Sequence, residues 1–189
     1  MDLGVQRMAA DLSQRRYRYR QAVGGFFAVA LVILAVPSPQ AFYIGAPLVV
    51  LGLSVRLWAA GHVHKNEELA TTGPYALVRH PQYLGNNLLA LGLCIASGVY
   101  LAIAVWALLF WLFYVPAIRR EDEKLRRRFE DQWVPWAEHT PAVFPRPRLS
   151  LGGGAERNWS LRQAVFNGEP IWFAGMVVAL ALIYLRIPR

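Results

Sequence analysis

The sequence predicts an all-α integral membrane protein, a single helical bundle with about five transmembrane helices and a cytoplasmic helical extension after the fourth. Three observations lead to this fold class. Apolar residues make up 56% of the 189-residue chain and the mean hydropathy is positive, which is typical of membrane proteins. These residues gather in runs long enough to cross a bilayer as helices. The Lys and Arg residues, which give a net charge of +8, flank the runs.

The first two predicted spans form a hairpin. Residues 1–21 are a basic lead-in, and because no convincing cleavage site follows the apolar run at 21–36, we expect a retained span there. Pro37-Ser38-Pro39 ends this run, and the second span covers 41–61. Arg56 lies inside the second span. An intramembrane arginine is a functional candidate by default, although its side chain can equally snorkel to the interface.

A polar segment, 62–82, leads from the second span to the third. It contains the turn dipeptide Gly73-Pro74. Pro81 disfavours the α conformation at His80 and itself suits the first position of a helix. The third span is therefore expected to begin at Pro81 and to cover 81–97.

The fourth span, 99–118, follows the uncharged turn Ser97-Gly98 and leads into the charged segment 119–150. If the helix continues past the span, at about 100° per residue its apolar side chains fall on one side. This stripe consists of Ile118, Leu125, Phe129, Trp133 and Trp136. The pattern predicts one continuous helix that leaves the membrane on the charged side.

The acids of this extension differ in the faces they occupy. Asp122 lies inside the apolar stripe and Glu121 at its edge, whereas Glu123 faces solvent. A carboxylate on a buried face needs a partner, since burying it unpaired is costly. One interpretation is therefore structural, an ion pair with Arg56, Arg79 or another arginine; the other is a functional site.

The last part of the chain is expected to hold a short helix in the membrane interface, within 155–169, and a fifth span at 170–187. Lys and Arg gather on the side shared by the N-terminus and the segments 62–82 and 119–169. By the positive-inside rule this side is cytoplasmic. We therefore expect a multi-pass protein with its N-terminus and its active site in the cytoplasm.

Composition and residue spacing also exclude several classes of site. The basic residues flank apolar runs and do not form a face interleaved with aromatics, so nucleic acid is not an expected partner. Cys94 is the only cysteine, so no internal disulfide forms. His62 and His64 have no third ligand at suitable spacing, and we expect no metal site.

The start of the third span has the properties of an anion site. Arg79 and His80 stand at the beginning of the helix expected from Pro81. The free N–H groups and the positive end of the helix dipole, with Arg79 beside them, suit a carboxylate or a phosphate.

The residues at 73–75 and 79–85 read Gly-Pro-Tyr, a short spacer and Arg-His-Pro-Gln-Tyr-Leu-Gly. This sequence resembles the motif shared by isoprenylcysteine carboxyl methyltransferases and the related phospholipid methyltransferases. Sterol reductases carry a similar His-Pro-x-Tyr element, so a second motif is needed to choose between them.

The second motif lies after the fourth span. It consists of Glu121, Asp122, Leu125, Phe129, Trp133 and Trp136. This spacing resembles the second motif of the same methyltransferases, with Asp122 in place of a glutamate, Glu130 in place of a glycine, and tryptophans in place of tyrosines. The substitution at Glu130 puts the tight turn after Phe129 in question. The two motifs in this order are fairly specific to the family.

The resemblance implies S-adenosyl-L-methionine as methyl donor, bound on the cytoplasmic side between the third and fourth spans. Its carboxylate would meet Arg79 and His80, and its ammonium or ribose hydroxyls an acid. The cofactor-binding residues are expected to be Tyr75, Arg79, His80, Pro81, Tyr83, Gly85, Glu121, Asp122 and Phe144. The residues assigned to catalysis are Arg56, His80 and Glu121. Methyl transfer is a linear displacement, for which alignment in a water-poor site contributes more than an acid or base.

The acceptor is expected to reach the site from the lipid bilayer, near Arg56 and Trp58. A prenylcysteine-like carboxylate, a lipid amine and a small thiol all remain open. One alternative function is a nicotinamide-dependent reductase of membrane sterols or alkenes, which the acids after the fourth span disfavour. A non-catalytic membrane protein that binds lipid is another.

Overall fold

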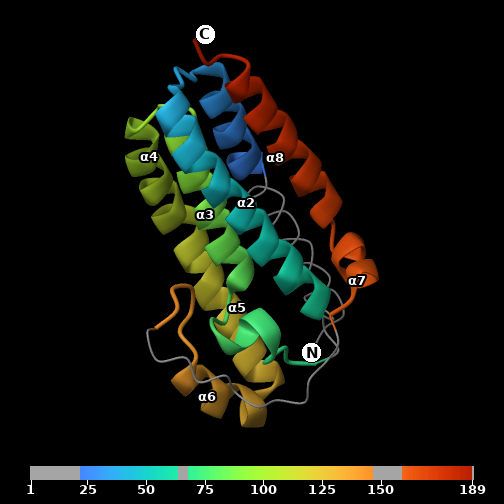
Figure 1. Cartoon of the computed structure of the whole chain (residues 1–189). Helices are drawn as coiled ribbons and strands as arrows, with labels where there is room; N and C mark the ends of the chain where they lie inside the picture. The colour runs from blue at the N-terminus through green and yellow to red at the C-terminus, as the bar shows by residue number, and fades with distance from the viewer. Residues whose placement is uncertain (1–21, 64–67, 147–158, 189) are drawn as a thin grey trace, which may run out of the picture.

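The computed structural model describes residues 22–63, 68–146 and 159–188, and within these ranges the chain forms helices and no β-strand. The predicted all-α class is therefore confirmed for the described residues. The main helices of the bundle lie side by side (Figure 1). They are the first described helix (Ala22–Ile33), α2 (Pro39–His62), α3 (Pro81–Ala96), the continuous helix Leu101–Arg128 and α8 (Glu169–Tyr184).

The helix boundaries follow the predicted spans closely. α2 begins at Pro39, where the Ser38 hydroxyl caps the helix by accepting a hydrogen bond from the Ala41 N–H at 3.2 Å. α3 begins at Pro81 as expected from the sequence. α2 and the helix Leu101–Arg128 are long and apolar enough to cross a membrane, whereas Ala22–Ile33 and α8 are shorter apolar helices.

The long helix Leu101–Arg128 has three parts. α4 (Leu101–Leu109) is followed by one wide π-helical turn, η2 (Phe110–Tyr114), and then by α5 (Val115–Arg128). The sequence predicted that this helix continues to Trp136, and that prediction is wrong. The backbone leaves the helical region at Phe129, with φ −131° and ψ 41°, and a separate helix α6 (Glu130–His139) begins there.

α2 and α3 approach each other through glycines. A Cβ added to Gly45 would lie 2.4 Å from the backbone nitrogen of Ala96, and one on Gly92 would lie 2.8 Å from the backbone nitrogen of Val49. Small residues allow helices to pack closely in the absence of a strong hydrophobic driving force. The most deeply buried apolar side chains, among them Leu31, Leu93 and Ile183, form a core between these helices, the first helix and α8.

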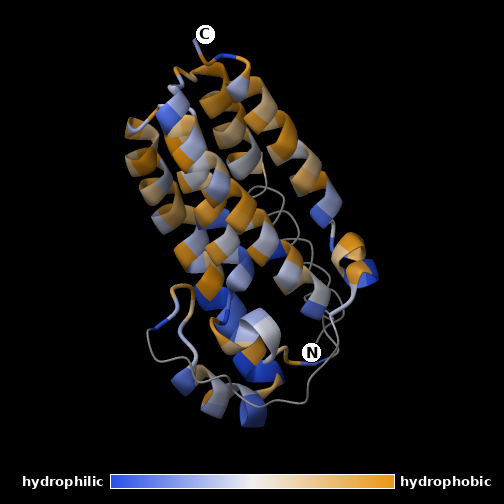
Figure 2. Ribbon diagram, in the orientation of Figure 1, coloured by the Kyte–Doolittle hydropathy of each residue, from blue (hydrophilic) through white to orange (hydrophobic). Residues whose placement is uncertain are grey.

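Hydrophilic residues gather at one end of the bundle, where α6 and the end of α5 lie, and the helices above this end are mainly hydrophobic (Figure 2). The short helix α7 (Leu161–Phe166) packs at the end of α2. Side chains of Trp159, Gln163 and Asn167 donate hydrogen bonds to the carbonyls of Leu57, Val63 and Ala60. The carbonyl of Ala60 lies in the last turn of α2 and has no partner within the helix, so Asn167 caps this end of α2. The predicted interface helix is partly represented by α7, and residues 155–158 lie outside the described residues.

Candidate functional site

Three segments that are far apart in the sequence meet at the start of α3. The backbone N–H of Arg79 donates to the carbonyl of Pro141 at 2.8 Å, and that of His80 donates to the carbonyl of Ala142 at 2.9 Å. The 3₁₀ turn η1 (Gly73–Ala76) precedes this contact. The first motif therefore lies directly against the proline-rich segment that follows α6.

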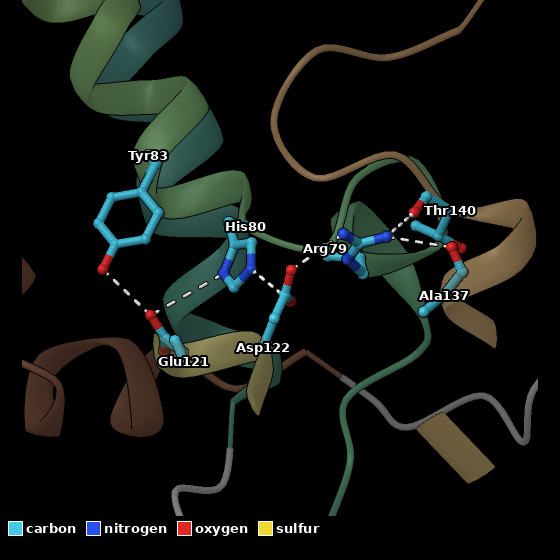
Figure 3. A network of polar contacts seen from close by, with 7 residues as sticks. All are labelled: Arg79, His80, Tyr83, Glu121, Asp122, Ala137 and Thr140. Atoms are coloured by element: carbon cyan, nitrogen blue, oxygen red, sulfur yellow. Dashed lines mark hydrogen bonds and ion pairs between the residues drawn. The ribbon is translucent and has the colours of Figure 1, made fainter. Parts of the chain in front are cut away.

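Asp122 of α5 joins the second motif to the first (Figure 3). Its Oδ2 accepts a hydrogen bond from Nη2 of Arg79 at 2.9 Å, and its Oδ1 accepts one from Nε2 of His80 at 2.9 Å. Burial raises the pKa of Asp122, but the hydrogen bonds from His80 and Arg79 outweigh burial, and the pKa lies below its ordinary value. Asp122 is thus ionised at neutral pH. Of the ion pairs left open by the sequence, the structure contains the one with Arg79.

Glu121 occupies the opposite, more open side of His80. Its Oε2 accepts a hydrogen bond from the hydroxyl of Tyr83 at 3.0 Å and lies 3.9 Å from Nδ1 of His80. The side chain of Glu121 is 50% exposed, compared with 17% for Asp122. Glu121 can therefore accept bonds from a further molecule, whereas the carboxylate of Asp122 is occupied on both oxygens.

Arg79 points away from the helix start, toward α6. Its Nη1 donates to the carbonyls of Ala137 at 3.0 Å and Thr140 at 2.7 Å, and its guanidinium lies over the ring of Trp133. Nε of Arg79 and Nε1 of Trp133 are buried and have no hydrogen-bond partner among the described residues. Buried N–H groups normally have an acceptor, so these two are exceptions within the described part of the chain.

The other predicted cofactor residues differ in accessibility. Tyr75 is buried, burial raises the pKa of its hydroxyl, and its carbonyl accepts a hydrogen bond from Nε1 of Trp136 at 3.2 Å. Pro81 is fully buried at the helix start. Phe144 is 64% exposed and is the aromatic side chain of the segment after α6 that a planar ring could reach.

Arg56 belongs to a separate buried cluster. Its Nε and Nη2 donate to the carboxylate of Glu169 at 3.1 and 2.9 Å, and its Nη1 donates to Oδ1 of Asn86. Its guanidinium also lies 4.8 Å from the ring centre of Trp172. The partner of Arg56 is thus Glu169 of α8 and not Asp122.

The buried Arg56 also explains the glycine of the first motif. A Cβ at Gly85 would lie 2.5 Å from Cγ of Arg56, so the arginine side chain passes directly over the glycine. Sequence reasoning did not single out Glu169, Asn86 or Trp172. The only signal for Glu169 was an acid directly before the span predicted at 170–187, whereas in the structure it is the first residue of α8.

A groove of about 570 Å³ lies between α2, α7 and α8 next to this cluster. Its lining is apolar except for Glu169. The other lining residues are Leu53, Leu57, Leu161, Val165, Pro170, Phe173, Ala174, Val177 and Val178.

The described residues contain no group of three His, Cys, Asp or Glu side chains that could hold a metal ion. Nδ1 of His62 instead donates to the carbonyl of Trp58 at 2.9 Å. His64 lies outside the described residues.

Comparison with known proteins supports the resemblance read from the motifs. The family profile described as phospholipid methyltransferase matches residues 40–132, which include both motifs up to Gln132. No solved structure matches the chain.

Three related proteins bear on the function of this chain. The chain is 38% identical over 148 residues to the cobalt-zinc-cadmium resistance protein CzcN of Cupriavidus metallidurans, covering 76% of this chain and 67% of that protein. It is 37% identical over 130 residues to the nickel-cobalt-cadmium resistance protein NccN of Alcaligenes xylosoxydans xylosoxydans, covering 66% and 59%. It is 31% identical over 98 residues to the protein-S-isoprenylcysteine O-methyltransferase of Schizosaccharomyces pombe, covering 52% and 42%. The chain thus spans between 42% and 67% of the lengths of these relatives.

Proposed function

The chain belongs to the family of isoprenylcysteine carboxyl methyltransferases and phospholipid methyltransferases, and we propose that it transfers a methyl group from S-adenosylmethionine to a lipophilic or membrane-delivered acceptor. The observation that carries the proposal is the junction of the two motifs at the polar end of the bundle. His80 bonds Asp122 while Glu121 stands beside it with half of its side chain exposed.

The residues at this junction suit the donor. Bound S-adenosylmethionine supplies an activated methyl group on a sulfonium and presents a carboxylate, an ammonium, ribose hydroxyls and an adenine ring. Glu121 would accept from the ammonium or the hydroxyls, because it is the acid with an open side. Exposed Phe144 would lie against the adenine ring.

Asp122 has a positioning role in this proposal. Its two oxygens hold Arg79 and His80, and the low pKa of Asp122 keeps these contacts charge-assisted at neutral pH. The residues of the site therefore bind and align the donor, which is what a displacement at the methyl carbon requires. No proton transfer to His80 is needed for this role.

We propose that the acceptor approaches from the bilayer through the apolar groove beside α7 and α8. Glu169 is the polar residue that lines the groove, it binds Arg56, and Arg56 reaches α3 through Asn86. Asn86 lies five residues after Pro81 in the same helix, a rise of about 8 Å. The acceptor would be a prenylcysteine-like carboxylate, a lipid amine or a small thiol.

We also propose how the chain is arranged in the membrane. Among the described helices, two are long and apolar enough to cross it, and the proposal adds three further spans. Five spans would place the basic end of the bundle, with the site, at the cytoplasmic face. The arginines in the last turn of α5, which lies at this hydrophilic end (Figure 2), support that orientation.

A second candidate function is a contribution to resistance against divalent metal ions, which the similarity to the two resistance proteins favours. Because the described residues offer no cluster of three metal ligands, methylation of a membrane component is the route we propose for it. Expression of the wild type and of Glu121→Gln in a bacterium sensitive to cobalt, zinc and cadmium tests this candidate. Protection by the wild type alone would support it, and equal protection by both would contradict it.

Calorimetric titration with S-adenosylhomocysteine tests the main proposal. Arg79→Ala and His80→Ala should each weaken binding by about tenfold or more, because each removes charge-assisted hydrogen bonds at the site. Arg120→Ala is the matched control, since Arg120 is exposed on α5 two residues before Asp122. Unchanged affinity in both site variants would refute the assignment of the donor site.

A further inference from the structure

The wide turn η2 interrupts the long helix shortly before its two acids. The N–H of Val115 donates to the carbonyl of Phe110, five residues earlier, instead of four as in an α-helix. Pro116 gives a physical cause for this turn. It has no N–H, and in an uninterrupted α-helix its ring would collide with the carbonyl of Leu112.

One extra residue in a turn changes the direction of every side chain that follows. In an unbroken α-helix, Ile118 would point about 120° and Asp122 about 160° away from Trp106. With one residue taken up by the wide turn, these angles fall to about 20° and 60°. Trp106 and Ile118 are 8% and 7% exposed, which agrees with the smaller angle because both are buried.

Tyr114, the last residue of η2, links this geometry to the site. It is 5% exposed, and its ring meets that of Tyr83 edge-on at a centroid distance of 5.7 Å. Tyr83 in turn contacts the ring of His80 at 5.6 Å and donates its hydroxyl to Glu121. On the other side, Tyr114 contacts Trp106 at 5.4 Å.

The geometry points to η2 as a positioning element for the donor site, with Tyr114 as its positioning residue. The wide turn sets the rotation of α5 so that Asp122 meets Arg79 and His80, and Tyr114 holds that rotation by packing on Tyr83. This inference rests on the proposed donor site and adds residues that belong to neither motif.

Deletion of Leu112 tests the inference, because it removes the extra residue from the bilayer-facing side of the turn, where Leu112 is 54% exposed. An unbroken α-helix that lacks this residue carries Asp122 about 60° from Trp106, which is the wild-type angle, so the deletion variant should bind S-adenosylhomocysteine within about threefold of the wild type. Inserting an alanine between Arg119 and Arg120 of the wild type keeps η2 and turns the two acids by about 100°, so it should weaken binding by about tenfold or more. Leu112→Ala is the control for loss of the side chain alone.

Wild-type affinity in the insertion variant would overturn the inference, as would a deletion variant that binds no better than the insertion variant. A wild type that does not bind S-adenosylhomocysteine would instead contradict the proposed function. Point variants give a second test that leaves chain length unchanged. Tyr114→Phe keeps the ring on Tyr83 and should bind normally, whereas Tyr114→Leu should lose affinity several-fold at a similar thermal midpoint. Equal affinity of these two variants would also overturn the inference.

Discussion

Glu169→Gln is expected to destabilise the bundle strongly, although Glu169 lies outside both motifs. Its carboxylate takes two hydrogen bonds from Arg56, and both side chains are only 7% exposed. Removing one partner of a buried ion pair leaves the other charge uncompensated, at a cost of about 3–5 kcal/mol. Arg56 keeps its contacts with Asn86 and Trp172, so the loss should lie near about 3 kcal/mol.

A double-mutant cycle separates this pairing from general damage to the bundle. Arg56→Met should destabilise to a similar extent, because it leaves Glu169 buried without its partner. The double variant should be more stable than the sum of the single effects predicts, by about 2 kcal/mol or more. Unfolding followed in detergent by denaturant and by heat measures all four proteins, and each single variant should lower the thermal midpoint by about 10 °C. Single effects that add to within about 0.5 kcal/mol would refute the buried pair.

Three further outcomes are expected. Glu121→Gln should weaken S-adenosylhomocysteine binding or slow methyl transfer, whereas Glu123→Gln should have almost no effect because Glu123 is exposed. A larger loss of affinity in Glu123→Gln than in Glu121→Gln would contradict the rotation of α5. Acidification should destabilise the wild type more than Asp122→Asn. Because folding lowers the pKa of Asp122, the stability that its carboxylate contributes is complete above the ordinary pKa of about 4 and is lost as the pH falls through the pKa of the folded state. Thermal midpoints of both proteins between pH 6 and pH 3 would record this difference. Gly85→Ala should lower the thermal midpoint, because the added Cβ would lie 2.5 Å from Cγ of Arg56. Gly175→Ala is the control and should be neutral or stabilising, since no atom lies within 4 Å of a Cβ at that position. Equal effects of the two substitutions on the midpoint would argue against the close packing at Gly85.

A local sequence signal predicted the start of α3, and the family resemblance implied that the two motifs share one site. Pro81 fixes a helix start through its own backbone geometry, so no tertiary information was needed to place it, whereas α2 begins at Pro39, two residues before the predicted span. The positions of Asp122 and Glu121 relative to the apolar stripe could also be predicted from the helical periodicity. The structure agrees that Glu123 is exposed while Asp122 is partly buried.

Features that depend on contacts between distant segments could not be predicted. The break at Phe129 follows from tertiary contacts, since Trp133 packs on Arg79 and Trp136 bonds the carbonyl of Tyr75. Periodicity alone gives no sign that α6 folds back toward η1.

The partner of Arg56 was missed for the same reason. Glu169 follows Arg56 by 113 residues, and an arginine in a span can pair with any acid on the same side of the membrane. The roles of the remaining site residues, from Tyr75 to Phe144, stay predictions until a donor is bound.

Thermal stability of the purified protein with and without S-adenosylhomocysteine tests the central claim most directly. Binding to the folded state raises the thermal midpoint in proportion to the logarithm of ligand concentration above the dissociation constant. We expect S-adenosylhomocysteine to raise the midpoint, with a smaller rise in Glu121→Gln, and NADPH at the same concentration to leave it unchanged. Stabilisation by NADPH and none by S-adenosylhomocysteine would contradict a methyltransferase and favour the reductase alternative.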